Sequence, residues 1–451
     1  MSSLSESPAK LVPAFGGHLL DATDAAYETV RRVHNGFIDK RPALIACCRG
    51  TADVADAVKV ARKLGLEIAV RGGGHNVAGR ASVDGGAMID LLPMKGIHVD
   101  VAARTARAQG GVLWKEFNRE TQLHGLATTG GVVGSTGIAG LTLGGGLGWL
   151  MPKYGLALDN LRAAELVLAD GTVARASADQ NPDLFWAIRG GGGNFGIATW
   201  LEYTLHPVGP VITGGLVAYK ASDARDVLRF YRERCGSLPP ELMLVAGLLT
   251  GPDGSKLVGL VAGHCGDAAA GEAAVRPIKA FGAPVLDAMG PIPYNDLNGL
   301  LDPSFPKGAL NYWKAHFLSD LSDGAIDVLV DAAAAAPTPM CQLVVEHFHG
   351  KATEVPVSAT ACTLRTPGFN AVIIGQWMDR ADTDRTIAWA RETYQALGPH
   401  LGTTRYVNYL AHDDENLARS AYGPNYDRLR DVKRRYDPDN VFHINVNIEP
   451  A

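Results

Sequence analysis

The feature that most constrains this chain is a glycine triplet that ends in a histidine, within AVRGGGHNVAG at residues 69–79. Gly72, Gly73 and Gly74 leave a loop without side chains, and an imidazole, His75, follows at once. Glycine lets bare N–H groups approach a bound anion closely, and successive N–H groups form a concave anion-binding nest. Because the apolar run EIAV precedes the triplet, we expect this loop to follow a short strand.

Four glycine-rich loops, RGGGHN, GGVVGSTGIAG, LGGGLG and RGGGGNFG, lie between residues 71 and 196. A single loop of this kind is most simply a turn, but four together favour a large, extended, phosphate-bearing ligand. The segment GGGNFG at 191–196 matches G-x-G-x-x-G, yet a predicted helix precedes it and a predicted strand follows it. A nicotinamide-dinucleotide fold requires the opposite order, and no P-loop motif occurs, so both of these nucleotide-binding folds are disfavoured.

The length of 451 residues and the formal net charge of −5 limit the class of protein. The length predicts two or three domains, and the charge argues against nucleic acid and anionic membranes as partners. No apolar run reaches membrane length, and the N-terminal MSSLSESPAKLVPAFGG has no apolar signal core. We therefore expect a cytoplasmic protein, although an export signal removed from the chain would leave no trace. The six cysteines have no C-x-x-C spacing, so we expect free thiols and no metal site.

The order of predicted elements changes after Pro210. Before it, helices such as TADVADAVKVARK and LWKEFNRETQ alternate with short strands, and NPDLFWAI predicts a helix capped by Asn181. After it, strands are predicted in the runs VITGGLVAYK, ELMLVAGLLTG, KLVGLVAGHCG, CQLVVEHFHG and FNAVIIGQW. Helical patterns lie between these runs, which predicts an α+β domain around an antiparallel sheet.

Several longer motifs add a resemblance to a known family: VRGGGHNVAG, GLTLGGGLGWLMPKYGLALDN, DLFWAIRGGGGNFGI, and the tail segments YVNYLAHD and YGPNYDRLRDVKRRYDPDNVFHINVNI. They resemble the berberine-bridge-enzyme-like FAD-linked oxidases of the vanillyl-alcohol-oxidase superfamily, which also includes 6-hydroxynicotine oxidase. The likeness runs from about residue 40 to the C-terminus and is weakest between residues 210 and 360. It implies a two-domain α+β fold of the PCMH type. Residues 1–208 would form the FAD-binding domain, 209–404 an antiparallel-sheet substrate domain, and 405–451 a segment that returns to the FAD domain.

The resemblance implies that the loop at 71–75 wraps the FAD pyrophosphate and that His75 is bonded covalently to the flavin 8α carbon. A neutral imidazole is a nucleophile, which makes this bond chemically reasonable; a hydrogen-bonded loop histidine is the simpler alternative. Some relatives carry a second tether from a cysteine, but the matching residue here is Val133, so a single attachment is expected. The residues that the resemblance assigns to FAD are Arg71, Gly72, Gly73, Gly74, His75, Asn76, Gly79, Gly134, Thr136, Gly137, Gly140, Thr142, Gly144, Gly146, Ile197, Asn445 and Asn447.

The same resemblance points to Tyr409 in YVNY as a base or as a hydrogen-bond partner of the substrate, with a core tyrosine as the alternative. Read as a strand, YVNY would place Tyr409 and Val407 on one side and Tyr406 and Asn408 on the other. Relatives often carry a carboxylate on the strand that resembles FNAVIIGQW, where this chain has Asn370 and, further along the same face, Gln376. An amide cannot take a proton, so either another group is the base or Tyr409 only orients the substrate. Further candidates for the cavity wall are Trp313, His347, His349 and Trp377.

The activity that these motifs imply is oxidation of a small alcohol, amine or natural product. A hydride would pass from a C–H bond to flavin N5, and O2 would then take the electrons and become H2O2. A dehydrogenase with another electron acceptor is the main alternative, and a flavin-binding protein without turnover is a second. The sequence leaves the substrate and the oligomeric state open.

Overall fold

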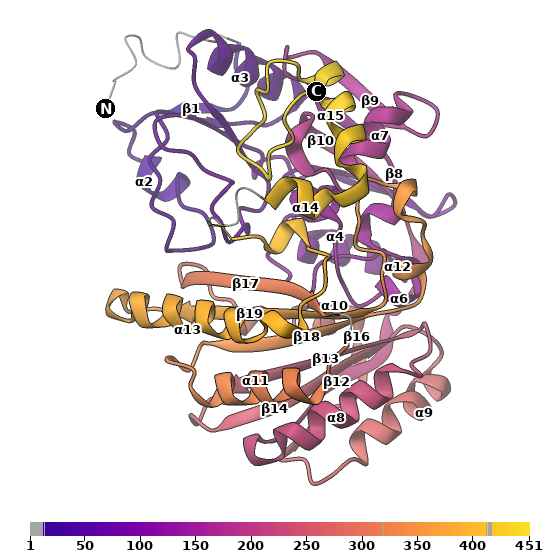
Figure 1. Cartoon of the computed structure of the whole chain (residues 1–451). Coiled ribbons are helices and arrows are strands. Elements are labelled where there is room, and N and C mark those ends of the chain that lie inside the picture. Colours follow the sequence, from indigo (N-terminus) through magenta and orange to yellow (C-terminus); the bar gives the residue numbers. More distant parts are fainter. Residues whose placement is uncertain (1–11, 13, 319, 412, 414–416) are drawn as a thin grey trace.

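The computed structural model describes residues 12, 14–318, 320–411, 413 and 417–451 of the chain (Figure 1). Most of the N-terminal stretch in which no signal core was found lies outside the described residues. The chain forms an upper part that contains both described ends and a lower part built on one large sheet (Figure 1). Among the described residues, no helix is long and apolar enough to cross a membrane.

The upper part contains two main sheets with helix α3 between them. The first has the order β1-β2-β4-β3, and its strands are β1 His18–Leu20, β2 Leu44–Cys47, β3 Ile68–Arg71 and β4 Ala87–Asp90. The second is antiparallel with the order β5-β6-β10-β8-β9, and its strands are β5 Ile97–Asp100, β6 Thr105–Gln109, β8 Leu161–Val167, β9 Val173–Ser177 and β10 Ile197–Thr204. Helix α3, Thr51–Lys63, buries Val54, Val58 and Ala61 at the predicted helical spacing and contacts both sheets.

The remaining elements of the upper part are short. They are α2 Tyr27–Val30, α4 Trp114–Gln122, β7 Leu126–Ala127, α5 Ile138–Gly144, α6 Met151–Tyr154, α7 Pro182–Ile188 and β11 His206–Pro207. Asn181 precedes α7 as predicted, but its side chain makes no capping hydrogen bond. It has a φ of 50°, and its amide instead donates to the carbonyl of Arg175, so the expected cap was wrong.

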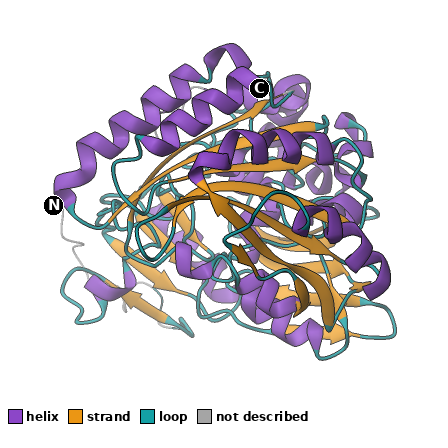
Figure 2. Ribbon diagram, turned by 90° about the horizontal axis from the view of Figure 1, so that it is seen from below, coloured by secondary structure: helices purple, strands orange, loops and turns teal. Residues whose placement is uncertain are grey.

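The lower part is an eight-stranded antiparallel sheet in the order β15-β12-β14-β13-β18-β19-β17, with β16 paired to β12. Its strands are β12 Val211–Lys220, β13 Leu242–Thr250, β14 Lys256–His264, β15 Leu286–Asp287, β16 Gly290–Pro293, β17 Leu310–Leu318, β18 Gln342–Phe348 and β19 Gly368–Trp377. One face is covered by helices α8 Ala224–Cys235, α9 Ala268–Lys279, α11 Asp323–Ala334 and α13 Thr383–Ala396 (Figure 2). The strands predicted after Pro210 all occur, which confirms the α+β fold with an antiparallel-sheet second domain.

The C-terminal segment packs back on the upper part of the molecule. Helix α15, Tyr426–Tyr436, contacts α7, and the buried Lys433 ammonium donates to the carbonyl of Asn194 at 2.7 Å. Lys433 also forms a buried ion pair with Asp437 at 2.6 Å, so the tail is fixed by charge-assisted bonds. Short helices complete the chain: α10 Tyr294–Gly299, α12 Lys351–Glu354 and α14 Ala418–Tyr422.

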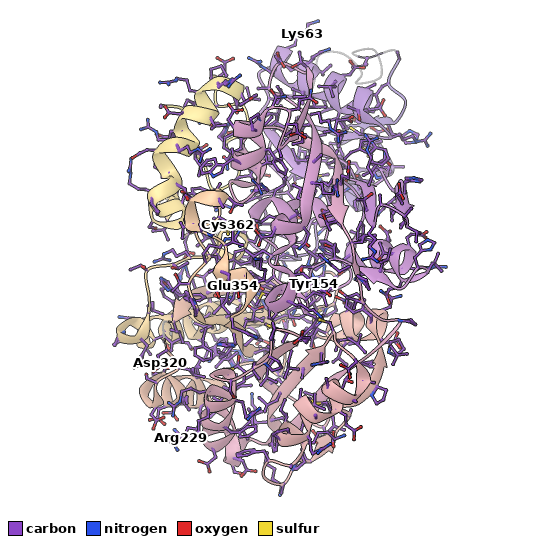
Figure 3. All side chains as sticks on the ribbon, turned by 90° about the vertical axis from the view of Figure 1, so that its right-hand side faces the viewer. Lys63, Tyr154, Arg229, Asp320, Glu354 and Cys362 are labelled. Atoms are coloured by element: carbon purple, nitrogen blue, oxygen red, sulfur yellow. The ribbon has the colours of Figure 1, made fainter. Side chains whose placement is uncertain are left out.

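A shared apolar cluster joins the upper and lower parts. Trp149 and Leu156 from the upper part pack in the same cluster as Met243, Phe317 and Phe348 from the large sheet. Tyr154 and Cys362, which belong to this region, are labelled at mid-height in Figure 3. This junction positions the glycine loops of the upper part opposite the face of the large sheet that helices α8, α9, α11 and α13 do not cover.

Candidate active site

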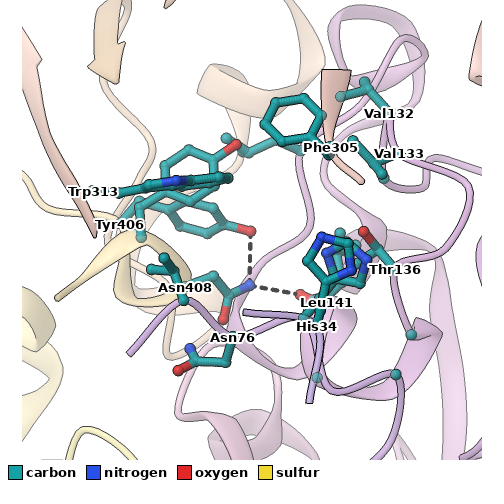
Figure 4. A pocket seen from close by; sticks show the side chains of 18 of the residues that line it. His34, Asn76, Val132, Val133, Thr136, Leu141, Phe305, Trp313, Tyr406 and Asn408 are labelled. Carbon is teal, nitrogen blue, oxygen red and sulfur yellow. Dashed lines mark hydrogen bonds between the residues drawn. The ribbon is translucent and has the colours of Figure 1, made fainter. Parts of the chain in front are cut away.

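A cavity lies at the junction of the two parts, and the centres of water molecules could occupy about 370 Å³ of it. The upper part contributes the glycine loops with His75 and Asn76, and the large sheet contributes its face opposite to the helices. Figure 4 shows how side chains from the two parts converge, with Thr136 and His34 on one side and Trp313 on the other. Pockets for small molecules and cofactors commonly form at such domain junctions.

Glycine is required where the loops of the upper part meet. A Cβ atom added to Gly73 would lie 2.2 Å from the backbone nitrogen of Gly137, and one added to Gly137 would lie 2.3 Å from that of Gly73. The two loops therefore touch backbone to backbone. Gly140 and Gly192 also line the cavity, and a Cβ added to either would meet no protein atom within 4 Å. Bare backbone thus faces open space, as an anion-binding or dinucleotide-binding cradle requires.

His75 lies on the cavity wall and is held by two neighbours. Its Nε2 atom is 2.8 Å from the hydroxyl of Ser135, and its ring stacks on His34 with the ring centres 3.7 Å apart. Burial lowers the pKa of His75 to about 3 and that of His34 to about 4. Both imidazoles are therefore neutral near pH 7, and a neutral ring nitrogen keeps the lone pair that a nucleophile needs.

The structure divides the residues assigned to FAD into two groups. Those that line the cavity are Gly72, Gly73, Gly74, His75, Asn76, Thr136, Gly137, Gly140, Ile197 and Asn445. Those that do not are Arg71, Gly79, Gly134, Thr142, Gly144, Gly146 and Asn447. Most of the first group comes from two loops, 72–76 and 136–140, which the glycine packing holds together.

Several members of the second group support the loops from behind. Arg71 is buried and forms a two-point ion pair with Asp90 at 2.8 and 2.6 Å, while the hydroxyl of Thr142 pairs with that of Tyr203 at 2.9 Å. The Gly134 N–H donates to the Asp302 carboxylate at 2.6 Å. These groups have protein partners behind the loops, and their direct contact with the cofactor stays a prediction.

The YVNY segment fits into the LGGGLG loop. The hydroxyl of Tyr406 accepts hydrogen bonds from the Gly146 N–H at 2.9 Å and from the Asn408 amide at 2.8 Å. The same amide donates to the carbonyl of Leu141 at 3.1 Å, and both Asn408 bonds are drawn in Figure 4. The predicted strand alternation is wrong, because Val407–Tyr409 form a 3-10 turn. Residues three apart share a side in such a turn, so Tyr406 and Tyr409 both line the cavity.

The carboxylate that the sequence analysis missed is Glu346 on β18. Its side chain is buried at the cavity wall and accepts hydrogen bonds from the Asn370 amide at 2.7 Å and from the Tyr409 hydroxyl at 3.3 Å. Asn370 lies directly opposite Glu346 in the pairing of β18 with β19. The structure thus brings Tyr409 and Asn370 together, as predicted residues of one site, around an acid that no motif had indicated.

Burial controls the protonation of this group. It raises the pKa of Glu346 from 4.5 to about 7, against the opposing effect of the hydrogen bonds from Asn370 and Tyr409. The pKa of Tyr409 is raised well above 10 by burial and by the neighbouring Glu346 charge. Near pH 7, Tyr409 therefore remains a phenol and a hydrogen-bond donor, whereas Glu346 exists in comparable amounts as acid and carboxylate.

Of the other residues predicted to line the cavity wall, some lie on the cavity face of the large sheet and some do not. Trp313 lines the cavity with its ring centre 6.1 Å from that of Tyr409, as an edge contact. His347 and His349 stack on each other with ring centres 4.7 Å apart, but neither lines the cavity, because β18 turns Glu346 toward it. Trp377 is buried in the core on the helix side, where its indole donates to Thr383.

Gln376 does not belong to the Tyr409 constellation. It lies six positions beyond Asn370 on β19, which corresponds to roughly 20 Å of extended strand. Its amide donates to Asn311 at 3.2 Å, so the structure does not bring it together with Tyr409 and Asn370, and its catalytic role stays a prediction. The signal that could have identified Glu346 was an acidic residue inside the mostly apolar strand QLVVEHF, because an acid is rarely buried without a partner.

Comparison with known proteins agrees with this site. Residues 42–177 match the FAD binding domain family, and residues 405–449 match the "Berberine and berberine like" family. The chain is 31% identical over 455 residues to (R)-6-hydroxynicotine oxidase of Paenarthrobacter nicotinovorans, which covers 96% of this chain and 97% of that one. An FAD-linked oxidoreductase of Dictyostelium discoideum is also 31% identical, over 94% of this chain and 92% of that one.

Solved structures give the same result. The crystal structure of 6-hydroxy-D-nicotine oxidase from Arthrobacter nicotinovorans superposes with a TM-score of 0.90 at 28% identity, over 99% of this chain and 100% of that one. Physcomitrella patens BBE-like 1 superposes with a TM-score of 0.88 at 22% identity over 99% of both chains, which supports the fold alone. This protein is therefore an FAD-dependent enzyme that belongs to the berberine-bridge-enzyme-like family of FAD-linked oxidoreductases.

Proposed function

We propose that this enzyme oxidises a small organic molecule at a carbon that bears a hydroxyl or amino group, with Glu346 as the base and O2 as the final electron acceptor. The observation that carries the proposal is the Tyr409–Glu346–Asn370 cluster at the cavity wall, opposite the glycine loops. The proposal is supported by the presence, on one cavity wall, of one group that can accept a proton and one that can donate a hydrogen bond.

The residues of the upper part fit FAD. Gly140 and Gly192 present backbone to open cavity space, and the contact between Gly73 and Gly137 joins two loops into one continuous surface. Such a surface suits a pyrophosphate, because N–H groups can reach its oxygens without interference from side chains. The chemistry that FAD supplies when bound is acceptance of a hydride at N5, after which O2 receives the two electrons as H2O2.

His75 is proposed to hold the cofactor covalently. Its neutral ring is fixed by Ser135 at one nitrogen and by the stacked His34 ring on one face. In the tautomer that carries its proton on Nε2, this N–H donates to the Ser135 hydroxyl, and Nδ1 keeps the free lone pair that can bond. No described cysteine lines the cavity, and Val133 occupies the wall of the matching loop, so a single attachment is proposed.

The three residues of the cluster have separate tasks. Glu346, as the carboxylate, accepts the proton of the substrate O–H or N–H group while the hydride leaves the adjacent carbon. Asn370 holds one carboxylate oxygen, which fixes the direction of the other. Tyr409 remains protonated, so its hydroxyl donates to Glu346 or to the substrate heteroatom and orients it.

The test is peroxide release from the holoenzyme with a panel of small alcohols, amines and sugars, together with the rate at which O2 reoxidises the reduced enzyme. Rapid reoxidation and peroxide release with one class of compound are expected. Reduction by a substrate followed by reoxidation over many minutes would favour a dehydrogenase with another acceptor. Absence of reduction by every compound under anaerobic conditions would contradict the proposed catalytic role.

A further inference from the structure

The large sheet presents a mostly apolar surface to the cavity, in which Asn311, Gln342 and Glu346 are the amide and carboxylate side chains among the described lining residues. Its cavity-facing side chains include Met243, Val245 and Leu249 from β13, Val261 from β14, and Val372 and Ile374 from β19. A sugar would bring several hydroxyl groups against this surface, and each buried hydroxyl without a partner costs about 1–3 kcal/mol. The wall therefore suits an apolar molecule with a single polar head.

One charge interrupts this surface. Among the described cavity-lining residues of the large sheet, Glu346 is the only one that can ionise, and it forms no ion pair with a described lysine or arginine. The arginine on the cavity, Arg80, belongs to the opposite wall and donates to the carbonyls of Ile444 and Asn445. A carboxylate oxygen has two acceptor sites, so Glu346 retains capacity beyond its bonds to Asn370 and Tyr409.

A row of aromatic rings begins at the carboxylate, where the Tyr409 hydroxyl donates to Glu346 at 3.3 Å. Trp313 contacts Tyr409 with the ring centres 6.1 Å apart, and Phe305 lies 5.8 Å from Trp313 (Figure 4). Tyr406 completes this edge with its ring centre 4.8 Å from that of Tyr409. Aromatic faces attract organic cations, and a desolvated carboxylate does so more strongly, so the combination selects an ammonium group.

We infer that the substrate is a small, mostly apolar amine whose protonated nitrogen binds at Glu346 beside the ring of Tyr409, with its apolar part toward Trp313. This inference depends on the proposed function and specifies its substrate class. Glu346 accepts one N–H proton, which leaves a neutral amine. The α C–H bond then breaks, its electron pair leaves as hydride to the bound FAD, and the nitrogen lone pair forms the C=N bond of an iminium product. O2, already named as the acceptor, takes up the two electrons.

The binding test uses a matched pair of compounds with the holoenzyme, phenyltrimethylammonium and its neutral isostere tert-butylbenzene, followed by intrinsic tryptophan fluorescence. The wild-type protein is expected to bind the cation at least about tenfold more tightly than the isostere, which is a difference of about 1.4 kcal/mol. Glu346→Gln should remove this preference. Gln342→Ala is the matched control, because Gln342 lines the cavity on the same strand without a charge, and it should retain the preference.

Measurements of turnover distinguish a failure of the amine assignment from a failure of the proposed oxidase function. N-methylbenzylamine is expected to release peroxide faster than benzyl alcohol, and cellobiose should release none. Equal binding of the two isosteres, or turnover of cellobiose in preference to the amine, would overturn the amine assignment and leave the oxidase proposal intact. Selective binding of the cation without reduction of the enzyme by any amine, alcohol or sugar would uphold the ammonium site and overturn the oxidase.

Discussion

Replacement of Glu346 by Gln should change catalysis and stability in opposite directions: the activity should fall, and the free energy of unfolding above pH 7 should rise. The shift in the pKa of Glu346 from 4.5 to about 7 corresponds to about 3 kcal/mol of free energy. Because the pKa is raised in the folded state, this contribution to stability is present below pH 4.5 and is lost as the pH rises through 7. Above that pH, the buried charge costs the wild-type fold about 3 kcal/mol, and the neutral amide does not have this cost.

The variant can keep both hydrogen bonds of the wild-type side chain. Its amide oxygen can accept from Asn370, and its amide nitrogen can donate to the Tyr409 hydroxyl, which then acts as the acceptor. What it cannot do is accept a proton, so kcat/KM should fall by about 10²–10⁴. The wild-type enzyme should lose activity below pH 7 as Glu346 becomes protonated, and the residual activity of the variant should lack this limb.

The assay is urea unfolding of both holoproteins at pH 5 and pH 8.5, with initial rates measured on the same samples. Glu354→Gln serves as the control, because Glu354 has a 64% exposed side chain on the surface helix α12. The expected result is that Glu346→Gln gains up to about 3 kcal/mol over the wild type between the two pH values and loses its activity. A stability difference that is the same at both pH values, or wild-type kcat/KM in the variant, would refute the reasoning.

Three further substitutions test the upper part of the molecule, which is proposed to bind FAD. His75→Ala should leave FAD that dissociates when the protein is denatured in acid, whereas wild-type FAD should stay in the pellet; free flavin from both would contradict the attachment. Gly137→Ala places a Cβ 2.3 Å from the Gly73 nitrogen, so flavin content should fall and unfolding free energy should decrease by about 1–3 kcal/mol. Asp90→Asn leaves Arg71 as a buried cation with a weakened partner and should cost about 3–5 kcal/mol in urea unfolding; a cost below 1 kcal/mol would show that the pair is solvated.

The parts of the fold that followed from sequence are those in which local signals and tertiary structure agree. A glycine triplet indicates a loop whose backbone approaches another group closely. The contact between Gly73 and Gly137 shows why a residue with a Cβ atom does not fit there. The strands after Pro210 were predictable because runs of β-branched and apolar residues suit a sheet that is buried on both faces. The same property prevented a prediction of which face each side chain occupies. A strand such as β19 is buried at every position, so its sequence has no alternation of polar and apolar residues that would mark the two faces.

The errors at the site have local physical causes. YVNY reads as a strand from its composition, but the bonds from Gly146 and Asn408 to the Tyr406 hydroxyl hold the segment in a tight turn. In EHFHG, the two histidines were assigned to the cavity wall instead of the glutamate. The alternation of a strand correctly predicted that both histidines share one face. The packing of the upper part against the large sheet decides which face of the sheet lines the cavity. This packing depends on contacts between segments that are distant in the sequence.

The pairing of Glu346 with Asn370 explains how an amide can occupy a position where an acid was expected. The two residues are directly opposite on adjacent strands, where side chains on one face lie close enough for contact. A carboxylate on either strand could therefore reach Tyr409, but two carboxylates facing each other would raise the pKa of one of them further. Asn370 avoids this repulsion, and its N–H donation at 2.7 Å opposes the effect of burial on Glu346. The amide thus keeps the pKa of the buried acid near 7, where a base can both take up a proton and release it in each turnover.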